Sequence, residues 1–231
     1  MIKTVFEAGA LAILIASLAG PALAADKPPV VVELFTSQGC SSCPPANANL
    51  IKLSQRPDVL ALSFAVTYWD YLGWKDSFDA PEYTDRQVAY EPPLGQQGPY
   101  TPQMVINGAT TTVGVDLNEA EGLVNNARPL TGPAVALQDD RVSVGAATAP
   151  GTGADVWLVR YDPNVVNVPV ARGENTGRTL PHTHVVHALE RLGSWSGTSE
   201  TFAVAAAPAG MKTAVLVQVP NGGPILSAAT D

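Results

Sequence analysis

The sequence predicts an α/β first half followed by a β-sandwich-like region that begins at residue 130. Three observations support this prediction. Apolar strand-like runs alternate with helical patterns as far as Pro129. The only two cysteines, Cys40 and Cys43, lie at the first junction between a strand and a helix. Short β-rich runs separated by turns follow Pro129 to the end of the chain.

The first predicted strand and helix lie on either side of the cysteine pair. Val30 to Thr36 is an apolar, β-branched run without alternation, as expected for a strand buried on both faces. Pro44 and Pro45 then mark a helix start, because proline is tolerated in the first helical turn and not deeper. This helix is expected to end before Pro57.

Five further elements complete the first half. Asn107-Gly108 indicates a tight hairpin turn, and Asp116 is predicted to cap the last helix. The elements are a strand over 59–67, a helix over 81–90, strands over 103–107 and 110–113, and a helix over 116–128. The resulting order, β-α-β-α-β-β-α, is the minimal thioredoxin arrangement with an inserted loop over 68–80. We therefore predict a thioredoxin-like domain over residues 28–129.

The N-terminal segment is predicted to be a signal peptide over residues 1–24. An apolar core over 9–20 precedes the small-residue pattern Ala22-Leu23-Ala24, which predicts cleavage after Ala24 or Ala25. The alternative is an uncleaved N-terminal anchor. Cleavage would leave a periplasmic or secreted bacterial protein without stable membrane insertion, in a compartment where disulfides persist.

Charge and size limit the classes of function. The formal net charge is −8 and the basic residues are scattered, so nucleic acid and anionic membranes are not expected partners. About 205 residues would remain after cleavage, enough for a core that needs no disulfide. A bridge between Cys40 and Cys43 would close a very small loop and constrain the unfolded chain little. Reactivity therefore explains the pair better than stability does.

The cysteine pair predicts thiol–disulfide chemistry. Cys40 precedes a helix N-terminus, where partial positive charge and free N–H groups stabilise a thiolate, so it is the expected nucleophile and the more exposed sulfur. Cys43 would be the resolving thiol. Two alternatives remain: an inert disulfide, or a metal site completed by His or carboxylate ligands. We expect no cofactor, and we expect a protein thiol or disulfide as substrate together with an external redox partner.

Several long motifs resemble one family of secreted bacterial proteins, domain of unknown function 1223. They are Val32 to Pro45, Tyr68 to Asp76, Tyr100-Thr101-Pro102-Gln103 and Arg172-Gly173-Glu174-Asn175, and together they span most of the chain. The resemblance implies a thioredoxin-like fold and leaves the activity open.

Likeness to thioredoxin-like proteins also implies roles for Pro102 and Glu33. Such proteins carry a cis-proline where Pro102 precedes the third strand, whereas the alternative is an ordinary trans proline. A buried acid at the strand position of Glu33 assists proton transfer to the resolving cysteine, with a pKa raised by burial. The alternative is a Glu at a strand edge that reaches water or a salt bridge.

Aromatic and polar residues near the predicted edge of the sheet form a second group. Tyr68, Trp69 and Trp74 in the insertion, with Tyr100 and Thr101 before the third strand, are predicted to bind substrate. The alternative is that the insertion covers a small core of its own.

The second half, residues 130–231, is predicted to be β-rich and either separate or packed on the first half. The 172–178 loop is a candidate for surface recognition, or else a turn that satisfies its own backbone. All three histidines, His182, His184 and His187, fall in one run, with the first two predicted on the same face of a strand, so a two-His metal site stays open. The predicted strands cover 134–138, 141–145, 155–161, 165–170, 184–192, 201–206, 213–219 and 225–228.

Overall fold

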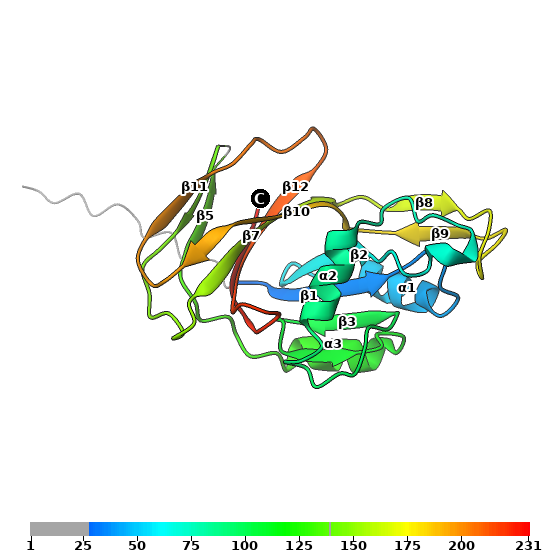
Figure 1. Cartoon of the computed structure of the whole chain (residues 1–231), viewed down its shortest axis with the longest axis horizontal. Helices are drawn as coiled ribbons and strands as arrows, with labels where there is room; N and C mark the ends of the chain where they lie inside the picture. Colours follow the sequence, from blue (N-terminus) through cyan, green and yellow to red (C-terminus); the bar gives the residue numbers. More distant parts are fainter. Residues whose placement is uncertain (1–27, 139) are drawn as a thin grey trace, which may run out of the picture.

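The computed structural model describes residues 28–138 and 140–231. The predicted signal peptide, residues 1–24, lies outside the described residues. The described strands form an eight-stranded sheet, a three-stranded sheet and a two-stranded sheet. The protein is a mixed α/β structure in which the large sheet crosses the molecule (Figure 1).

The first half has the predicted order of elements. The pairs β1–β2 and β1–β3 are parallel and antiparallel respectively, and β4 pairs with β3 at the sheet edge. The elements are β1 (Val30–Thr36), α1 (Cys43–Leu53), β2 (Val59–Ala65), the 3₁₀ turn η1 (Asp70–Leu72), α2 (Pro81–Ala89), β3 (Gln103–Ile106), β4 (Thr110–Thr112) and α3 (Leu117–Asn125).

Local sequence signals explain where these elements begin and turn. Proline occupies the first turn of α1, as predicted. The Asp116 side chain caps α3 by accepting a hydrogen bond from Asn118 N at 2.9 Å. Asn107 and Gly108 both have positive φ, at 50° and 63°, which is the geometry of a tight hairpin turn between β3 and β4.

The two faces of the first-half strands pack against different helices. Val32 and Leu34 of β1 lie in a buried cluster with Ala46 and Leu50 of α1. Alternate β1 residues face the opposite side, where the buried cluster includes Tyr83 of α2 and Tyr90 at its C-terminal end. Because side chains alternate along a strand, the helix against which a β1 residue packs is set by whether its number is odd or even.

The second half does not close on itself as a sandwich. Its elements are β5 (Val135–Gln138), β6 (Arg141–Val144), β7 (Ala154–Asp162), β8 (Val166–Pro169), β9 (Thr179–His182), β10 (Val185–Trp195), β11 (Glu200–Ala203), β12 (Lys212–Gln218) and β13 (Ile225–Thr230). Four of these strands extend the first-half sheet in the order β13-β12-β7-β10-β2-β1-β3-β4.

The junction between the halves explains this correction to the sandwich prediction. β10 pairs with β2 in parallel, and Ser63 N donates to His184 O at 2.8 Å. An open β2 edge would expose unpaired backbone groups, and the second half covers that edge. The buried residues Phe35, Val159 and Leu216 consequently belong to one core that spans both halves.

The predicted two-sheet packing is present in part. β5, β6 and β11 form the three-stranded sheet, and Val142 and Val144 of β6 pack against Val156 and Val217 of the large sheet. The fully buried Trp195 lies in the same cluster. A sandwich-like layer therefore exists at one end of the molecule, built on an extension of the first-half sheet (Figure 1).

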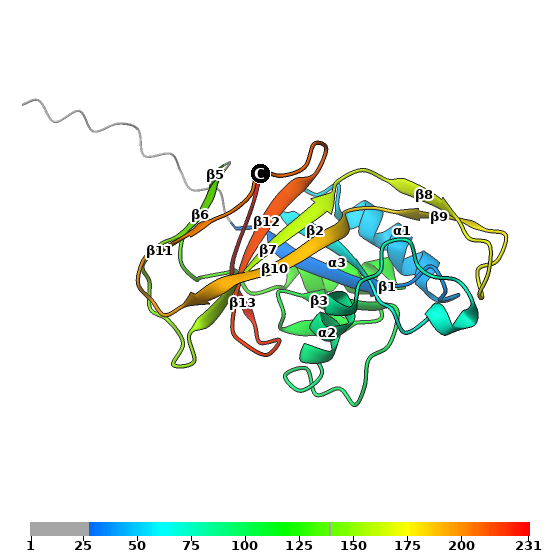
Figure 2. The same ribbon diagram turned by 45° about the horizontal axis from the view of Figure 1, so that its top comes forward.

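Strand β9 is not among the strands predicted from the sequence. It pairs antiparallel with β8 to make the two-stranded sheet, and residues 170–178 form the tip of this hairpin. The hairpin projects from the large sheet and lies beside α1 (Figures 1 and 2). A segment of the second half is thereby brought to the helix that follows the cysteines.

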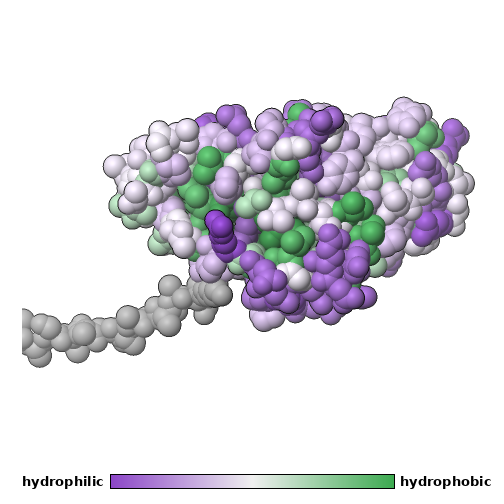
Figure 3. Space-filling view, turned by 90° about the horizontal axis from the view of Figure 1, so that it is seen from below, coloured by the Kyte–Doolittle hydropathy of each residue, from purple (hydrophilic) through white to green (hydrophobic). Residues whose placement is uncertain are grey.

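No helix in the described ranges is long and apolar enough to cross a membrane. The face seen in Figure 3 carries apolar residues in separate patches between polar ones.

Candidate functional site

The cysteine loop, residues 37–42, connects the end of β1 to the start of α1. Cys40 N donates to Ser37 O at 3.2 Å, and Gly39 N donates to Ser37 Oγ at 3.0 Å. Cys43 N donates in turn to Cys40 O at 3.3 Å. These bonds form a tight turn that places both sulfurs at the carboxyl end of β1, beside the N-terminus of α1.

Cys40 lies close to Ser42 and Thr101. Its Sγ lies 3.3 Å from Ser42 Oγ, and in the protonated form the thiol donates to Thr101 O at 3.8 Å. A hydrogen bond from the Cys43 thiol is the main cause that lowers the pKa of Cys40, to about 6, with help from Ser42 and Thr101 and against the opposing effect of burial. The Cys40 thiol is therefore substantially ionised at neutral pH.

Cys43 behaves in the opposite way. Burial raises the pKa of the Cys43 thiol far above its ordinary value, and the neighbouring Cys40 raises it further. The Thr36 side chain hydrogen-bonds the Cys43 sulfur, and Thr36 Oγ1 donates to Asn47 Oδ1 at 3.0 Å. The sequence analysis missed Thr36, which shares the α1-facing side of β1. The pair thus has one acidic and one protonated thiol.

The prediction that Cys40 is the more exposed sulfur is wrong. Both cysteines have a relative exposure of 0%, whereas Ser41 and Ser42 between them are exposed. Helix starts are commonly exposed, and the sequence carries no direct signal of the segments that pack over this one.

The segment before β3 reaches the cysteine site through Thr101. The Thr101–Pro102 peptide bond is cis, and Pro102 is buried. Thr101 offers its carbonyl oxygen to the Cys40 thiol, and its Oγ1 accepts a hydrogen bond from Trp69 Nε1 at 2.7 Å. The structure thereby joins Trp69, Thr101 and Cys40 in one contiguous group.

Tyr68 and Tyr100 connect this group to α2. Tyr68 OH donates to Gln87 Oε1 at 3.1 Å, and Gln87 Nε2 donates to Tyr100 O at 2.7 Å. Burial raises the pKa of the Tyr68 hydroxyl. Trp69 also stacks with Tyr71, with ring centroids 6.4 Å apart, and Tyr71 is 77% exposed. An accessible aromatic surface therefore borders the cysteine site.

The proton-transfer role predicted for Glu33 is not supported by its position. Glu33 faces α2, opposite to the α1 face on which Cys43 lies. Its carboxylate accepts hydrogen bonds from Arg86 Nε at 2.6 Å and from Tyr90 OH. The salt-bridge alternative is confirmed, although the ion pair is fully buried rather than at a strand edge. Glu33 alternates along β1 with Val32 and Leu34, which face α1, so its side chain points to the α2 side.

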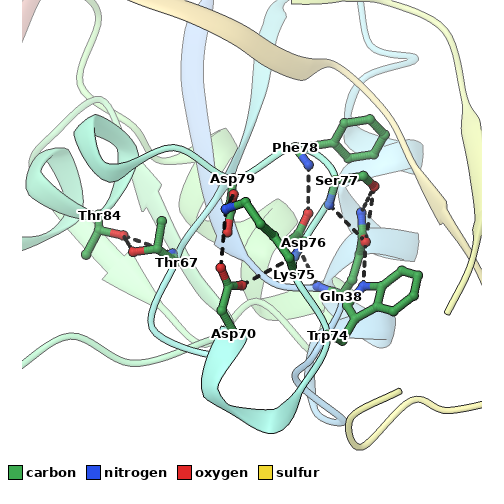
Figure 4. A network of polar contacts seen from close by, with 10 residues as sticks. All are labelled: Gln38, Thr67, Asp70, Trp74, Lys75, Asp76, Ser77, Phe78, Asp79 and Thr84. Atoms are coloured by element: carbon green, nitrogen blue, oxygen red, sulfur yellow. Dashed lines mark hydrogen bonds and ion pairs between the residues drawn. The ribbon is translucent and has the colours of Figure 1, made fainter. Parts of the chain in front are cut away.

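Trp74 contacts Gln38 of the cysteine loop (Figure 4). Trp74 Nε1 donates to Gln38 Oε1 at 2.9 Å, and Gln38 Nε2 donates to Ser77 Oγ at 2.9 Å. Asp76 Oδ2 accepts from Gln38 N at 2.7 Å. The 68–80 insertion therefore holds one side of the cysteine loop.

Asp76 is a buried carboxyl group that the sequence analysis did not single out. Its relative exposure is 2%, and its other oxygen accepts from Phe78 N at 3.0 Å. Burial raises the pKa of Asp76 to about 6, and the nearby Asp70 and Asp79 carboxylates add to the shift. Lys75 Nζ lies 3.4 Å from Asp70 Oδ2 and 2.7 Å from Asp79 Oδ1 (Figure 4). Its positive charge partly balances the negative charge of these carboxylates.

The other side of the cysteine loop is held by the tip of the β8–β9 hairpin. Glu174 Oε2 accepts from Ser41 N at 2.9 Å. Asn175 Nδ2 donates to Gln38 O at 3.0 Å and to Cys40 O at 2.7 Å. The 172–178 loop satisfies part of its own backbone, since Thr176 N donates to Gly173 O at 3.2 Å and Arg178 N donates to Asn175 O at 3.0 Å. It also contacts the cysteine loop through Glu174 and Asn175. Its family-like motif was the signal that could have indicated this role.

The histidines do not share a strand face. His182 ends β9, and His184 adopts a positive φ of 49° between β9 and β10. Phe78 makes edge contacts with His182 and His187, each with 5.8 Å between ring centroids. Burial lowers the pKa of His182 to about 4, so it is neutral at pH 7. Across 28–138 and 140–231, no group of three or more His, Cys, Asp or Glu side chains is placed to hold a metal.

A protein-family model described as a protein of unknown function, DUF1223, matches residues 31–219. The chain belongs to this family. The chain shares 33% sequence identity with protein AGR_C_4864 from Agrobacterium tumefaciens. The crystal structure of that protein matches this one with a TM-score of 0.69, and the match covers 87% of this chain and 92% of that chain. HBP35 of Porphyromonas gingivalis shares 14% sequence identity and gives a TM-score of 0.55, with 89% of this chain and 75% of that chain covered. This is a likeness of fold alone. The search of curated proteins found no match.

Alkylation of Cys40 in the reduced protein should follow a pH profile with its midpoint near 6. Cys43→Ala removes the main group that lowers the Cys40 pKa, so the midpoint should rise by about one pH unit or more. Ser42→Ala should raise it less, because the contribution of Ser42 is smaller. Iodoacetamide reaction rates across pH measure all three. A wild-type midpoint at the ordinary thiol value of about 8.5 would contradict this account of the site.

Asp76→Asn should change how stability depends on pH. Between about pH 4 and pH 6 the unfolded chain ionises Asp76 while the folded protein keeps it protonated, so its favourable contribution is lost as pH rises through this window. The free energy of unfolding of the wild type, minus that of the variant, should fall by about 2 kcal/mol from pH 4 to pH 7. Urea unfolding at several pH values measures it. A pH-independent difference would show that Asp76 keeps an ordinary pKa.

Proposed function

We propose that the protein is an exported, thioredoxin-like thiol–disulfide oxidoreductase in which Cys40 and Cys43 exchange with a substrate. The main support for this proposal is the difference in acidity between the two thiols. The pKa of Cys40 is lowered to about 6, and the pKa of Cys43 is raised by burial. A nucleophile that is ionised at neutral pH and a protonated resolving thiol are what sequential exchange requires.

The arrangement around the pair supports the thioredoxin-like assignment. The strands β2, β1, β3 and β4 are neighbours in this order, α1 begins at Cys43, and the cis bond before Pro102 lies beside Cys40. The mixed α/β order of the first half, β-α-β-α-β-β-α, is the minimal form of that fold.

Reduction of a substrate disulfide would proceed in two displacements. The Cys40 thiolate attacks one substrate sulfur, the substrate S–S bond breaks, and the leaving thiolate takes a proton from water. Cys43 then attacks the Cys40 sulfur and its proton passes to the departing substrate sulfur. The mixed disulfide bond breaks, the Cys40–Cys43 disulfide forms, and the second substrate thiol is released. Two electrons pass from the pair to the substrate, and an external dithiol or other reductant must return them.

The reverse direction uses the same atoms. A lowered Cys40 pKa stabilises the reduced pair, so the Cys40–Cys43 disulfide is a stronger oxidant than one made from ordinary thiols. An external oxidant would then regenerate the disulfide in the periplasmic or secreted environment.

A protein substrate would dock on the aromatic surface beside Cys40. Trp69 and the exposed Tyr71 supply stacked rings, and the Thr101 carbonyl lies beside Cys40. Tyr100 precedes Thr101 and is held by a hydrogen bond from Gln87 to its carbonyl oxygen. Aromatic surfaces with a few fixed polar groups are typical of binding sites. Trp74 would contribute indirectly, through its bond to Gln38.

A second candidate is a non-enzymatic binding protein with a structural disulfide or a soft-metal-binding thiol pair. One observation favours it: both cysteines are fully buried, and a sulfur that a substrate cannot reach cannot exchange. Metal content after purification under reducing conditions separates it from the first candidate, because a stoichiometric soft metal held by thiols would support the binding protein.

Single cysteine replacements test the enzyme proposal. Cys40→Ser should abolish disulfide exchange, because the attacking sulfur is gone. Cys43→Ser should accumulate mixed disulfides with substrate, because the second displacement cannot occur. Reduction of a model protein disulfide and mass spectrometry of trapped adducts are the measurements, with circular dichroism as the control for folding. Wild-type exchange by the Cys40→Ser protein would sink the proposal.

A further inference from the structure

The buried backbone of the cysteine loop is anchored by a residue more than a hundred positions later in the sequence. Asn175 has a relative exposure of 0% although asparagine is a polar residue. Its amide nitrogen, Nδ2, donates hydrogen bonds to Gln38 O at 3.0 Å and to Cys40 O at 2.7 Å. The amide therefore spans the turn on both sides of Gly39.

The orientation of this amide is fixed by a third contact. Arg178 Nη1 donates to Asn175 Oδ1 at 2.7 Å, so the amide nitrogen must face the cysteine loop. Arg178 belongs to the same hairpin tip and is exposed. A neighbouring bond, from Ser41 N to Glu174 at 2.9 Å, ties the tip to the next residue of the loop.

The contacts of Asn175 bear directly on the position of the Cys40 sulfur. Cys40 O accepts from both Asn175 Nδ2 and Cys43 N, so the peptide group after Cys40 has a fixed orientation. That peptide group joins Cys40 to Ser41, and the next residue, Ser42, hydrogen-bonds the Cys40 sulfur with its hydroxyl and its backbone N–H. Loss of the Asn175 bonds would leave Gln38 O buried without this donor and would free the turn to relax.

We propose that Asn175 is a positioning residue for the redox pair, through which the β8–β9 hairpin of the second half holds Cys40 in the geometry that stabilises its thiolate. The inference rests on the proposed function in that it concerns the same two sulfurs. It adds that the reactivity of Cys40 depends on a segment outside the predicted thioredoxin-like region.

The test compares Asn175→Asp and Asn175→Ala with wild type in the full mature chain. Aspartate keeps the shape but presents oxygen to two carbonyl groups, and alanine removes the contacts. Both should shift the pH midpoint of Cys40 alkylation upward by at least about half a unit, which means about threefold slower alkylation well below the midpoint. Thiolate ultraviolet absorbance of the reduced proteins gives the same midpoint independently.

Two variants in the same hairpin tip serve as controls. Thr176→Val removes a bond from Thr176 Oγ1 to Gly173 O but no contact to the cysteine loop, so it should keep the wild-type midpoint. Arg178→Ala frees the Asn175 amide to rotate and should shift the midpoint part of the way. If the Asn175 variants do not fold, Arg178→Ala decides the question.

Folded Asn175 variants with the wild-type midpoint would overturn the proposal. An equal shift in Thr176→Val would also overturn it, because any disturbance of the tip would then suffice. The alkylation midpoint does not require turnover of a substrate. A shift without exchange activity would therefore support the role of Asn175 and contradict the proposed function, so the two failures are distinguishable.

Discussion

The rest of the site depends on one constraint: the polar backbone of the cysteine loop is buried and must find hydrogen-bond partners. On one side, the Asp76 carboxyl group accepts a hydrogen bond from Gln38 N. On the other side, the Asn175 amide donates hydrogen bonds to Gln38 O and Cys40 O. Both partners come from segments added to the strand–helix–strand unit, namely the 68–80 insertion and the β8–β9 hairpin. The second half is thereby part of the site.

The different acidities of the two sulfurs follow from this arrangement. The fixed turn keeps Cys40 beside Ser42 and Thr101, whose side chains act with the Cys43 thiol to lower the pKa of Cys40. At Cys43 burial is the main cause that opposes ionisation, and Thr36 supplies the nearby hydroxyl. A lowered pKa on one thiol and a raised pKa on the other come from unequal solvation and hydrogen bonding over two intervening residues.

The sequence predicted what local chemistry determines. Proline at the start of α1, Asp116 as a cap and the Asn107-Gly108 turn gave correct elements, and the apolar run of β1 indicated burial on both faces. It did not predict which edge of the sheet the second half covers, because strand pairing between distant segments leaves no local pattern. The short β9 and the inward direction of Asn175 were missed for the same reason. Glu33 was predicted to act on Cys43, but it bonds Arg86 of α2. On a strand buried on both faces, the sequence alone does not show which helix an acidic side chain contacts.

The central claim is that the pair exchanges with a substrate rather than staying permanently closed. The most direct test is the reduction potential of the Cys40–Cys43 pair, measured by equilibration with glutathione buffers. The account predicts a value between about −120 and −270 mV, the range of exchange catalysts, and toward its oxidising end because the reduced pair is stabilised by the Cys40 thiolate. A value well below about −300 mV would identify a structural bridge and contradict the account.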